Sequence, residues 1–173
     1  MADLLERIEA LERSQPQDRL CLCVFSGDLD KMIAAFVIAT GAAASGMDVR
    51  MFFTFWGTSA LRDAGKSADK NLVGKMFGWM LPKGVRKLKL SKMQMLGAGR
   101  AMIRSIMKKQ GVASLEEMLD IAAELGVRIL VCTMSMDLMQ IKRTELIDYP
   151  HLEFVGVASF IELTAEAKST LFI

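Results

Sequence analysis

Cys132 is the residue whose type and position best suit covalent chemistry. It ends an apolar run in the stretch LVCTMSMDLMQI, and a methionine-rich, helix-like segment follows at once. The free N–H groups and dipole at a helix N-terminus stabilise a thiolate, which is a nucleophile. A cysteine at such a turn can therefore hold a transferred group covalently. The alternative is a small hydrophobe at the end of a buried strand, because free cysteines are often buried.

The other two cysteines are weaker candidates for covalent chemistry. Cys21 and Cys23 lie two apart in an apolar segment, so in a strand both side chains point to the same covered face. A C-x-C pair without a second pair or a nearby histidine is a weak metal site, and His151 has no evident partner. We expect both to be core residues and expect neither a metal nor a cofactor. Three cysteines without paired spacing favour a reducing cytoplasm.

The stretch SGDLDK, residues 26–31, is the second candidate for chemistry. Asp28 and Asp30 could bind a cation, but they serve equally well as a helix cap and a first-turn charge. The stretch lacks the Ser, Thr and Gly run of a flavin phosphate loop. The sequence has no P-loop, no G-x-G-x-x-G motif and no Ser-His-Asp set. A nucleotide- or flavin-binding enzyme is therefore only a third hypothesis.

Length and composition indicate one domain, residues 1–173, with an N-terminal helical extension over residues 1–16. Hydrophobic residues make up 52% of the chain, yet no apolar run reaches the ~18 residues of a membrane helix. The start, MADLLERIEALER, lacks the pattern of a basic, cleavable signal, so we expect no signal peptide. We expect no membrane span and a homo-oligomer that buries the excess apolar surface.

Basic residues are concentrated in one part of the chain. No acidic residue occurs between Asp69 and Glu116, yet this stretch holds half of the lysines and arginines. They are Lys70, Lys75, Lys83, Arg86, Lys87, Lys89, Lys92, Arg100, Arg104, Lys108 and Lys109. The stretch is either a solvated basic face or a docking surface for an acidic partner or an anionic substrate. Few aromatic residues are interleaved, so we expect no nucleic-acid binding.

The elements that must position these residues alternate between strand and helix. Apolar strands are expected at residues 19–27, 48–56 and 127–132, with shorter ones at 153–158 and 170–173. Helices are expected at residues 28–46 and, in an insertion over residues 57–126, at 59–62, 91–110 and 114–125. Ser114 and Glu117 form a capping box for the last of these. Thr133 or Ser135 would cap the helix that follows Cys132.

This alternation predicts an α/β, flavodoxin-like three-layer fold with a five-stranded, mainly parallel sheet. We expect the strand order 2-1-3-4-5, in which strands one and three are neighbours. Ligands bind beyond the carboxyl ends of such strands. Cys132 would then face Ser26, Gly27 and Asp28 across a crevice.

Several stretches, taken together, resemble the DsrE/DsrF/DsrH-like family, specifically its larger DsrE-like members linked to sulfur trafficking. They are FSGDLDK, FFTFWG, MFGWMLPKG, LSKMQM, CTMSMDLMQI and the ending LFI. The resemblance runs from about residue 20 to residue 173. It implies a flavodoxin-like fold, a homo-oligomer and one cysteine, matched by Cys132, that carries sulfane sulfur as a persulfide or thiosulfonate.

The resemblance also implies partners, namely TusA-like sulfur carriers and rhodanese-type proteins. The favoured hypothesis is a cytoplasmic sulfurtransferase or sulfur carrier. In it, the amides of residues 133–135, including Met134, stabilise the thiolate, and residues 26–28 shape the other wall. The alternative is a non-catalytic assembly or regulatory subunit in which Cys132 is merely buried.

Overall fold

The structure, a computed structural model, describes residue 7 and residues 15–70, 72–92 and 97–173. Its strands are β1 (Gln17–Val24), β2 (Asp48–Phe53), β3 (Arg128–Cys132), β4 (Leu152–Val155) and β5 (Ala167–Phe172). Its α-helices include α2 (Leu29–Ala44), α3 (Trp56–Ala60), α4 (Leu72–Met80), α5 (Ala98–Lys109), α6 (Leu115–Glu124), α7 (Thr133–Leu138) and α8 (Val157–Ala165). Two short 3₁₀ helices are η1 (Val85–Lys87) and η3 (Arg143–Glu145).

The five strands form one sheet in the order β4-β3-β2-β1-β5, and every pairing is parallel. The predicted α/β class with five parallel strands is confirmed. The predicted order 2-1-3-4-5 differs from the observed one, because β2 lies between β1 and β3 and β5 pairs with the free edge of β1. Strands β1 to β4 follow one another across the sheet, and only the last connection returns to β1.

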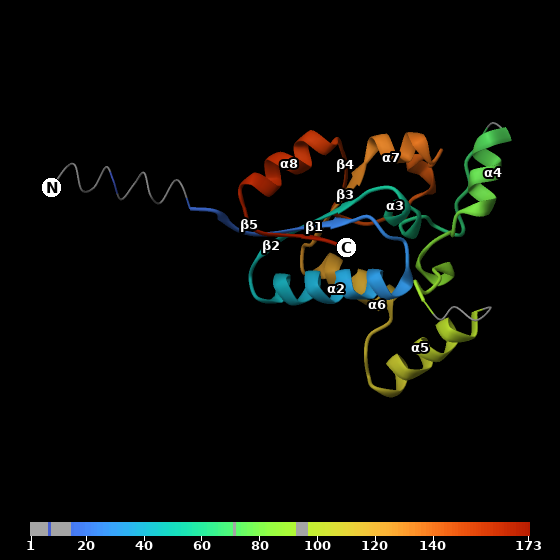
Figure 1. Cartoon of the computed structure of the whole chain (residues 1–173), viewed down its shortest axis with the longest axis horizontal. Helices are drawn as coiled ribbons and strands as arrows, with labels where there is room; N and C mark the ends of the chain where they lie inside the picture. The colour runs from blue at the N-terminus through green and yellow to red at the C-terminus, as the bar shows by residue number, and fades with distance from the viewer. Residues whose placement is uncertain (1–6, 8–14, 71, 93–96) are drawn as a thin grey trace.

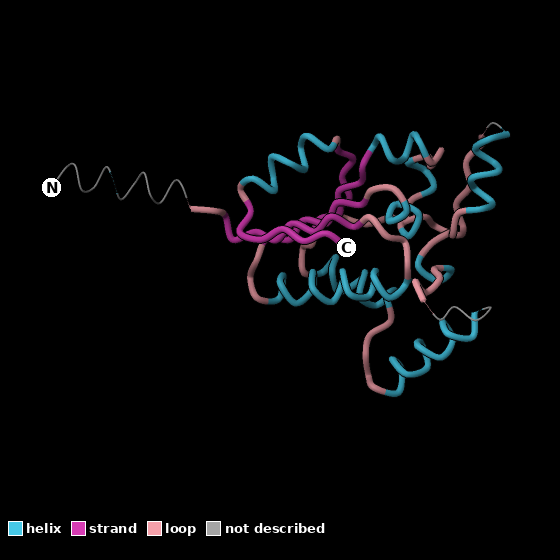
Figure 2. The backbone as a smooth tube through the Cα atoms, in the orientation of Figure 1, coloured by secondary structure: helices cyan, strands magenta, loops and turns pink. Residues whose placement is uncertain are grey.

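Helices cover both faces of the sheet (Figures 1 and 2). Helices α2 and α6 lie under one face, while α8 lies over the other and α7 lies beyond the end of β3. Helix α5 projects below α6, and α4 lies beside the edge where the parallel strands end. The chemistry-bearing loops therefore meet at the carboxyl edge of the sheet, next to α3, α4 and α7.

Strand alternation divides the core between the two faces. From β1, Leu20, Leu22 and Val24 join the large cluster that packs on α2 and α6. Cys21, with the buried residues Phe52, Leu130, Cys132 and Phe160, forms a small second cluster under α8, and Cys23 packs against it. The face under α8 therefore carries all three cysteines. It is covered by α8 and a small cluster, whereas the other face is covered by α2, α6 and the large cluster.

Local predictions had mixed outcomes. The capping box of α6 is confirmed, since Ser114 Oγ accepts from the Glu117 amide and Glu117 accepts from the Ser114 amide. Helix α8 was not predicted, and it separates β4 from β5 with Gly156 as its N-cap. Helix α4 was not recognised as a separate element. The helix expected over residues 1–16 lies almost entirely outside the described residues.

Candidate functional site

Cys132 is both the last residue of β3 and the N-cap residue of α7. This confirms the predicted placement at the junction of a strand with a helix N-terminus. The caps assigned to Thr133 and Ser135 were wrong, because α7 begins one residue earlier and no side chain caps it. The first turn of α7 has N–H groups without intrahelical acceptors. Cys132 is therefore beside backbone donors at the carboxyl edge of the sheet, where ligands of parallel sheets bind.

The side chain of Cys132 lines an apolar cavity of about 560 Å³. The walls come from β1, β2 and the loops that follow them, and from α7, α8 and β5. They are formed by Cys23, Phe25, Phe52, Thr54, Phe55, Met134, Val157, Phe160, Ile161, Thr164, Thr170, Leu171 and Phe172. Phe52 and Phe160 stack with ring centroids 4.4 Å apart, which anchors α8 over β2. Aromatic and aliphatic carbon therefore surrounds the thiol, and only 1% of Cys132 is exposed in the free chain.

Two hydrogen bonds from side-chain hydroxyls hold the loop that carries Cys132. Thr54 Oγ1 and Ser135 Oγ lie 2.7 Å apart in a buried hydrogen bond that links β2 to α7. Thr133 Oγ1 donates to the carbonyl of Val155 at 3.4 Å, which links α7 to β4. Cys132 is therefore held between its two neighbouring strands, and Thr133 and Ser135 position it without reaching the cavity wall.

The pKa values of the other two thiols are both raised. Burial is the main cause that raises the pKa of Cys21 above its ordinary value. Burial and then the negative charge of Cys132 raise the pKa of Cys23. Both are therefore neutral thiols at neutral pH and poor nucleophiles. Cys21 is the core residue that was predicted, whereas Cys23 is only half-buried and lines the same cavity as Cys132.

The structure does not bring Ser26, Gly27 and Asp28 to Cys132. Because β2 lies between β1 and β3, these residues line a second cavity that does not include Cys132. Ser26 Oγ donates to Asp28 Oδ2 at 2.9 Å, and Asp28 is the N-cap residue of α2. Asp30 accepts from the amide and hydroxyl of Ser91. Asp30 thus has the first-turn role that was an alternative to cation binding. The Asp28 side chain makes no capping hydrogen bond and instead accepts from Ser26 and lies near Lys31.

Consecutive residues of two loops line different cavities. Phe25 and Phe55 line the Cys132 cavity with ring centroids 5.4 Å apart, whereas Trp56, next in the chain, lines the second cavity. Phe55 has a left-handed backbone, with φ of 44°, a strained conformation for a non-glycine residue. At Gly57 a Cβ atom would lie 2.3 Å from the Val24 carbonyl oxygen, so only glycine allows this approach. The strain lies where the two cavities adjoin.

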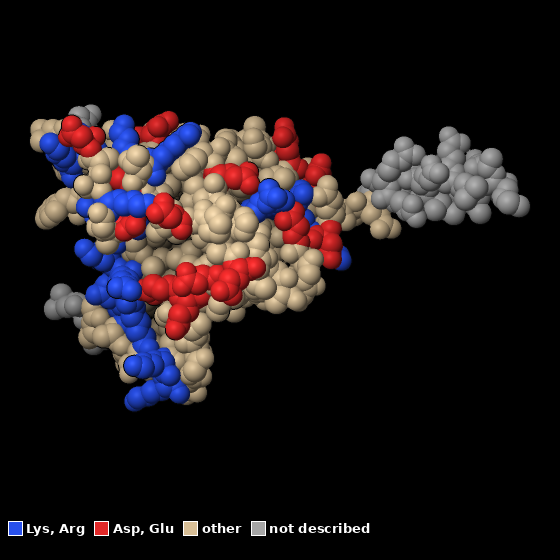
Figure 3. Space-filling model, turned by 180° about the vertical axis from the view of Figure 1, so that it is seen from behind, with Lys and Arg blue, Asp and Glu red and all other residues tan. Residues whose placement is uncertain are grey.

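Basic side chains gather in a band over η1 and α5, beside an acidic band over α6 (Figure 3). Part of the basic charge is used within the fold: Arg86 pairs with Glu116 at 3.3 Å, and Arg104 donates to backbone carbonyls of η1. Lys108 and Lys109 lie in the last turn of α5, where they complement the helix dipole. The rest of the band remains available to solvent or to a partner.

Two kinds of site are absent from the part of the chain that the structure describes. No group of three or more His, Cys, Asp or Glu side chains is arranged to hold a metal ion among residues 7, 15–70, 72–92 and 97–173. Within the same ranges, no helix has the length and apolar character needed to cross a membrane.

Sequence reasoning missed Cys23 and Thr54 as cavity residues. The alternation of side chains along β1 and β3 places Cys23 and Cys132 on the same face of the sheet. Only the strand order shows that β2 lies between these two strands and which of its residues separate the two cysteines. Phe160, the aromatic residue of α8, was missed because that helix was not predicted.

The sequence model of the DsrE/DsrF/DrsH-like family matches residues 16–172. The uncharacterized protein YrkE of Bacillus subtilis is 42% identical over 156 residues, which cover 90% of this chain and 96% of that protein. The sulfur carrier protein DsrE2 of Allochromatium vinosum is 34% identical over 161 residues, or 91% and 99% of the two chains. Among solved structures, the ychN protein from E. coli aligns with a TM-score of 0.49 at 13% identity, covering 91% of this chain and 99% of that one.

Proposed function

The chain belongs to the DsrE/DsrF/DrsH-like family, and from this premise we propose that it is a sulfur carrier or sulfurtransferase. Sulfane sulfur is held on the Sγ atom of Cys132 and passed to partner proteins. The family assignment and the relative that is a sulfur carrier protein support a role in sulfur trafficking. The residue and the chemistry are argued from the geometry of the site, whereas the partners are those that the family resemblance implies.

One observation carries the proposal: Cys132 ends β3 at the N-terminus of α7 and lines an apolar cavity of about 560 Å³. A water molecule takes about 30 Å³ of liquid, so the cavity has room for one or more added sulfur atoms. Sulfur makes favourable contacts with aromatic rings, and Phe52 and Phe160 supply them. An apolar wall also excludes water from a reactive intermediate.

The reaction needs no oxidant or reductant. The Cys132 thiolate attacks the sulfane sulfur of a donor, the donor's S–S bond breaks, and the donor leaves as a thiolate or sulfite. Cys132 then carries one additional sulfur as a persulfide. With a polythionate donor, thiosulfate leaves and Cys132 carries a thiosulfonate. In the second step an acceptor thiolate attacks the sulfane sulfur bonded to Sγ, the bond between them breaks, and the Cys132 thiolate is released.

The residues around Cys132 have distinct roles in this proposal. The backbone amides of residues 133–135 stabilise the thiolate, while the Ser135 hydroxyl fixes α7 against Thr54. Met134 lines the cavity and is half exposed, so it forms a soft, apolar entrance. Residues 26–28 line the second cavity and have no part in the chemistry at Cys132.

The proposed partners are TusA-like sulfur carriers and rhodanese-type proteins in the cytoplasm. The basic band over η1 and α5 (Figure 3) would attract an acidic partner and raise the rate of encounter. Such attraction weakens when salt shortens the Debye length to below ~10 Å. Transfer to a partner should therefore slow with rising salt, whereas reaction with a small neutral donor should not.

A homo-oligomer is also part of the proposal. Helix α8 and strand β5 expose Val157, Ile161 and Phe172, each more than half accessible in the free chain. These residues line the mouth of the Cys132 cavity. Exposed apolar patches of this kind mark interfaces, so a second copy of the chain would cover them.

Reaction with sulfur donors separates this function from the alternative, a non-catalytic assembly or regulatory subunit. The purified, reduced protein is incubated with polysulfide, tetrathionate or thiosulfate, and its intact mass is measured. A covalent adduct that a thiol reductant removes supports sulfur carriage. An unmodified protein under every donor supports the assembly role.

A further inference from the structure

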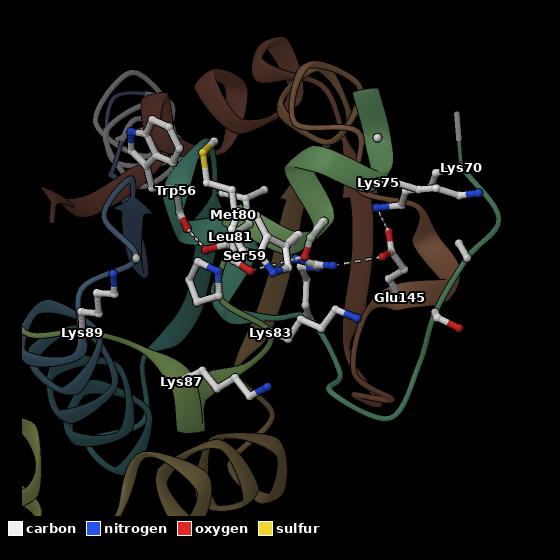
Figure 4. Close-up of a pocket in the computed structure, with 18 of the residues that line it drawn as sticks. Trp56, Ser59, Lys70, Lys75, Met80, Leu81, Lys83, Lys87, Lys89 and Glu145 are labelled. Carbon is white, nitrogen blue, oxygen red and sulfur yellow. Dashed lines mark hydrogen bonds and ion pairs between the residues drawn. The ribbon is translucent and has the colours of Figure 1, made fainter. Parts of the chain in front are cut away.

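The second cavity has a volume of about 780 Å³ and lies where β1 ends, between α3, α4 and the segment that leads to η1 (Figure 4). It contains none of the cysteines. Pockets of 300–1,000 Å³ are typical of small-molecule sites. The cavity is therefore a candidate binding site that the sulfur chemistry at Cys132 does not use.

The charges that line the cavity are strongly unbalanced. Six basic side chains face two carboxylates: Arg62, Lys70, Lys75, Lys83, Lys87, Lys89, Asp28 and Glu145. Both carboxylates already have partners within the protein. Asp28 accepts from the Ser26 hydroxyl and lies 3.6 Å from Lys31 Nζ, whereas Glu145 is paired inside the cavity wall. The walls thus carry positive charge that the protein does not neutralise.

At the base of the cavity, two cations share one anion. Glu145 Oε1 lies 3.2 Å from Arg62 Nη2, and Glu145 Oε2 lies 2.5 Å from Lys70 Nζ. The three side chains are 1%, 5% and 3% exposed for Arg62, Lys70 and Glu145, so a formal charge of +1 is buried. Uncompensated buried charge is costly, and a bound anion would remove this cost.

Arg62 also has an unused donor. Its Nη1 atom donates to the carbonyls of Gly78 and Leu81 at the end of α4, each at 3.4 Å. Its Nε atom is buried and has no hydrogen-bond partner among the described residues. A buried N–H group without a partner costs free energy.

Four lysines surround this base (Figure 4): Lys75, Lys83, Lys87 and Lys89. Within the described ranges, none of them forms an ion pair with a carboxylate. They come from α4, from the segment after it and from η1 and its flank, so the charge converges from separate segments. Lysine ammonium groups act as point charges for phosphate and other oxyanions.

One wall is apolar and consists of Trp56, Met80, Leu81 and Pro82. At about 30 Å³ per water molecule, the cavity is far larger than an inorganic ion requires. We propose that this cavity binds a small organic anion with two or more negative charges. Its charged groups would contact Arg62 and the lysines, and its apolar part would pack on Trp56.

Isothermal titration calorimetry with two probes tests this proposal. Adenosine triphosphate combines a polyanion with an aromatic base, and pyrophosphate has the charge without the apolar part. We expect both to bind, with the nucleotide at least about tenfold tighter because of the apolar wall. The variant Lys83→Gln/Lys87→Gln/Lys89→Gln should weaken nucleotide binding by about tenfold or more, while sulfur loading of Cys132 from a small neutral donor, which does not use the basic band, is unchanged.

The matched control is Lys108→Gln/Lys109→Gln, which removes two exposed charges on α5 away from the cavity. It should bind the nucleotide as the unmodified protein does. Failure of both probes to bind at millimolar concentration would overturn the proposal. So would equal weakening in the control, which would mean attraction to the basic surface in general. Tighter binding of an acidic peptide than of the nucleotide would also overturn it, because the site would then accept a protein segment.

Discussion

Cys23 and Cys132 line the same apolar cavity although the strand β2 separates the two strands that carry them. Neighbouring strands lie about 4.8 Å apart, so two strand spacings exceed the ~6.8 Å limit between the Cα atoms of a disulfide. The two thiols can therefore influence each other through charge but cannot form a direct disulfide in this fold. Cys23 is thus a matched control for Cys132.

The first prediction concerns the titration of Cys23. Burial and the negative charge of Cys132 raise the pKa of Cys23, so its alkylation rate should rise with a midpoint above the ~8.5 of a free cysteine. In Cys132→Ser that charge is absent, and the midpoint should move to lower pH. Site-resolved mass spectrometry of iodoacetamide labelling measures both rates. Identical midpoints in the two proteins would show that the thiols do not interact.

The second prediction concerns the hydrogen bond between Thr54 and Ser135. Thr54→Val or Ser135→Ala alone leaves a buried hydroxyl without a partner and should cost about 1–3 kcal/mol. The double variant removes both hydroxyls, so its cost should be smaller than the sum of the single costs. Urea unfolding of the parent, the two single variants and the double variant completes this double-mutant cycle. Additive effects would mean that the two hydroxyls act independently.

The third prediction concerns Glu145. Burial by itself would raise the pKa of Glu145, but the hydrogen bonds from Lys70 and Lys142 and the charges of Lys70 and Arg62 lower it below its ordinary value of 4.5. Its contribution to stability is therefore fully present above pH 4.5 and is lost as pH falls through the folded-state pKa.

Glu145→Gln should accordingly reduce the free energy of unfolding at neutral pH by about 3–5 kcal/mol, because two buried cations lose their anion. The variant should also lose part of the acid sensitivity of the parent protein. Urea unfolding between neutral pH and about pH 3 measures both effects. A parallel decline of variant and parent across this range would assign the acid sensitivity to other carboxylates, such as Asp48.

The fourth prediction concerns assembly. The 19.1 kDa chain should form a larger species in light scattering at micromolar concentration. Ile161→Glu places a charge in the exposed apolar face of α8 and should shift the population toward the single chain. Glu162→Gln, its neighbour on the same helix, should leave assembly unchanged. A single-chain mass for the unmodified protein would contradict the proposal of a homo-oligomer.

Sequence patterns predicted the local elements better than their arrangement. The apolar strands, the capping box of α6 and the placement of Cys132 before a helix all depend on residues close in sequence. The strand order depends on which edge of β1 the last strand occupies, and no local pattern encodes that choice. Predicting the wrong neighbours for β1 and β3 led to the pairing of Cys132 with residues 26–28.

The sequence predicted two parts of the second cavity, the basic stretch and the wall formed by residues 26–28, but not that they line one cavity without Cys132. The sequence shows that Lys83, Lys87 and Lys89 lie close together in the chain, but Glu145 comes from a segment more than 50 residues later. Its ion pairs with Arg62 and Lys70 exist only after the loop at η3 packs on α3 and α4. The concentration of basic residues could therefore be predicted from the sequence, whereas the buried cluster of Arg62, Lys70 and Glu145 could not.

The central claim is that Cys132 carries the transferred sulfur. The direct measurement is intact mass and peptide mapping of the parent, Cys132→Ser and Cys23→Ser after incubation with polysulfide, each with circular dichroism to confirm folding. The parent and Cys23→Ser should gain sulfur on the peptide that contains Cys132, and Cys132→Ser should gain none. A folded Cys132→Ser protein that still loads sulfur, or loading that disappears only in Cys23→Ser, would contradict this account.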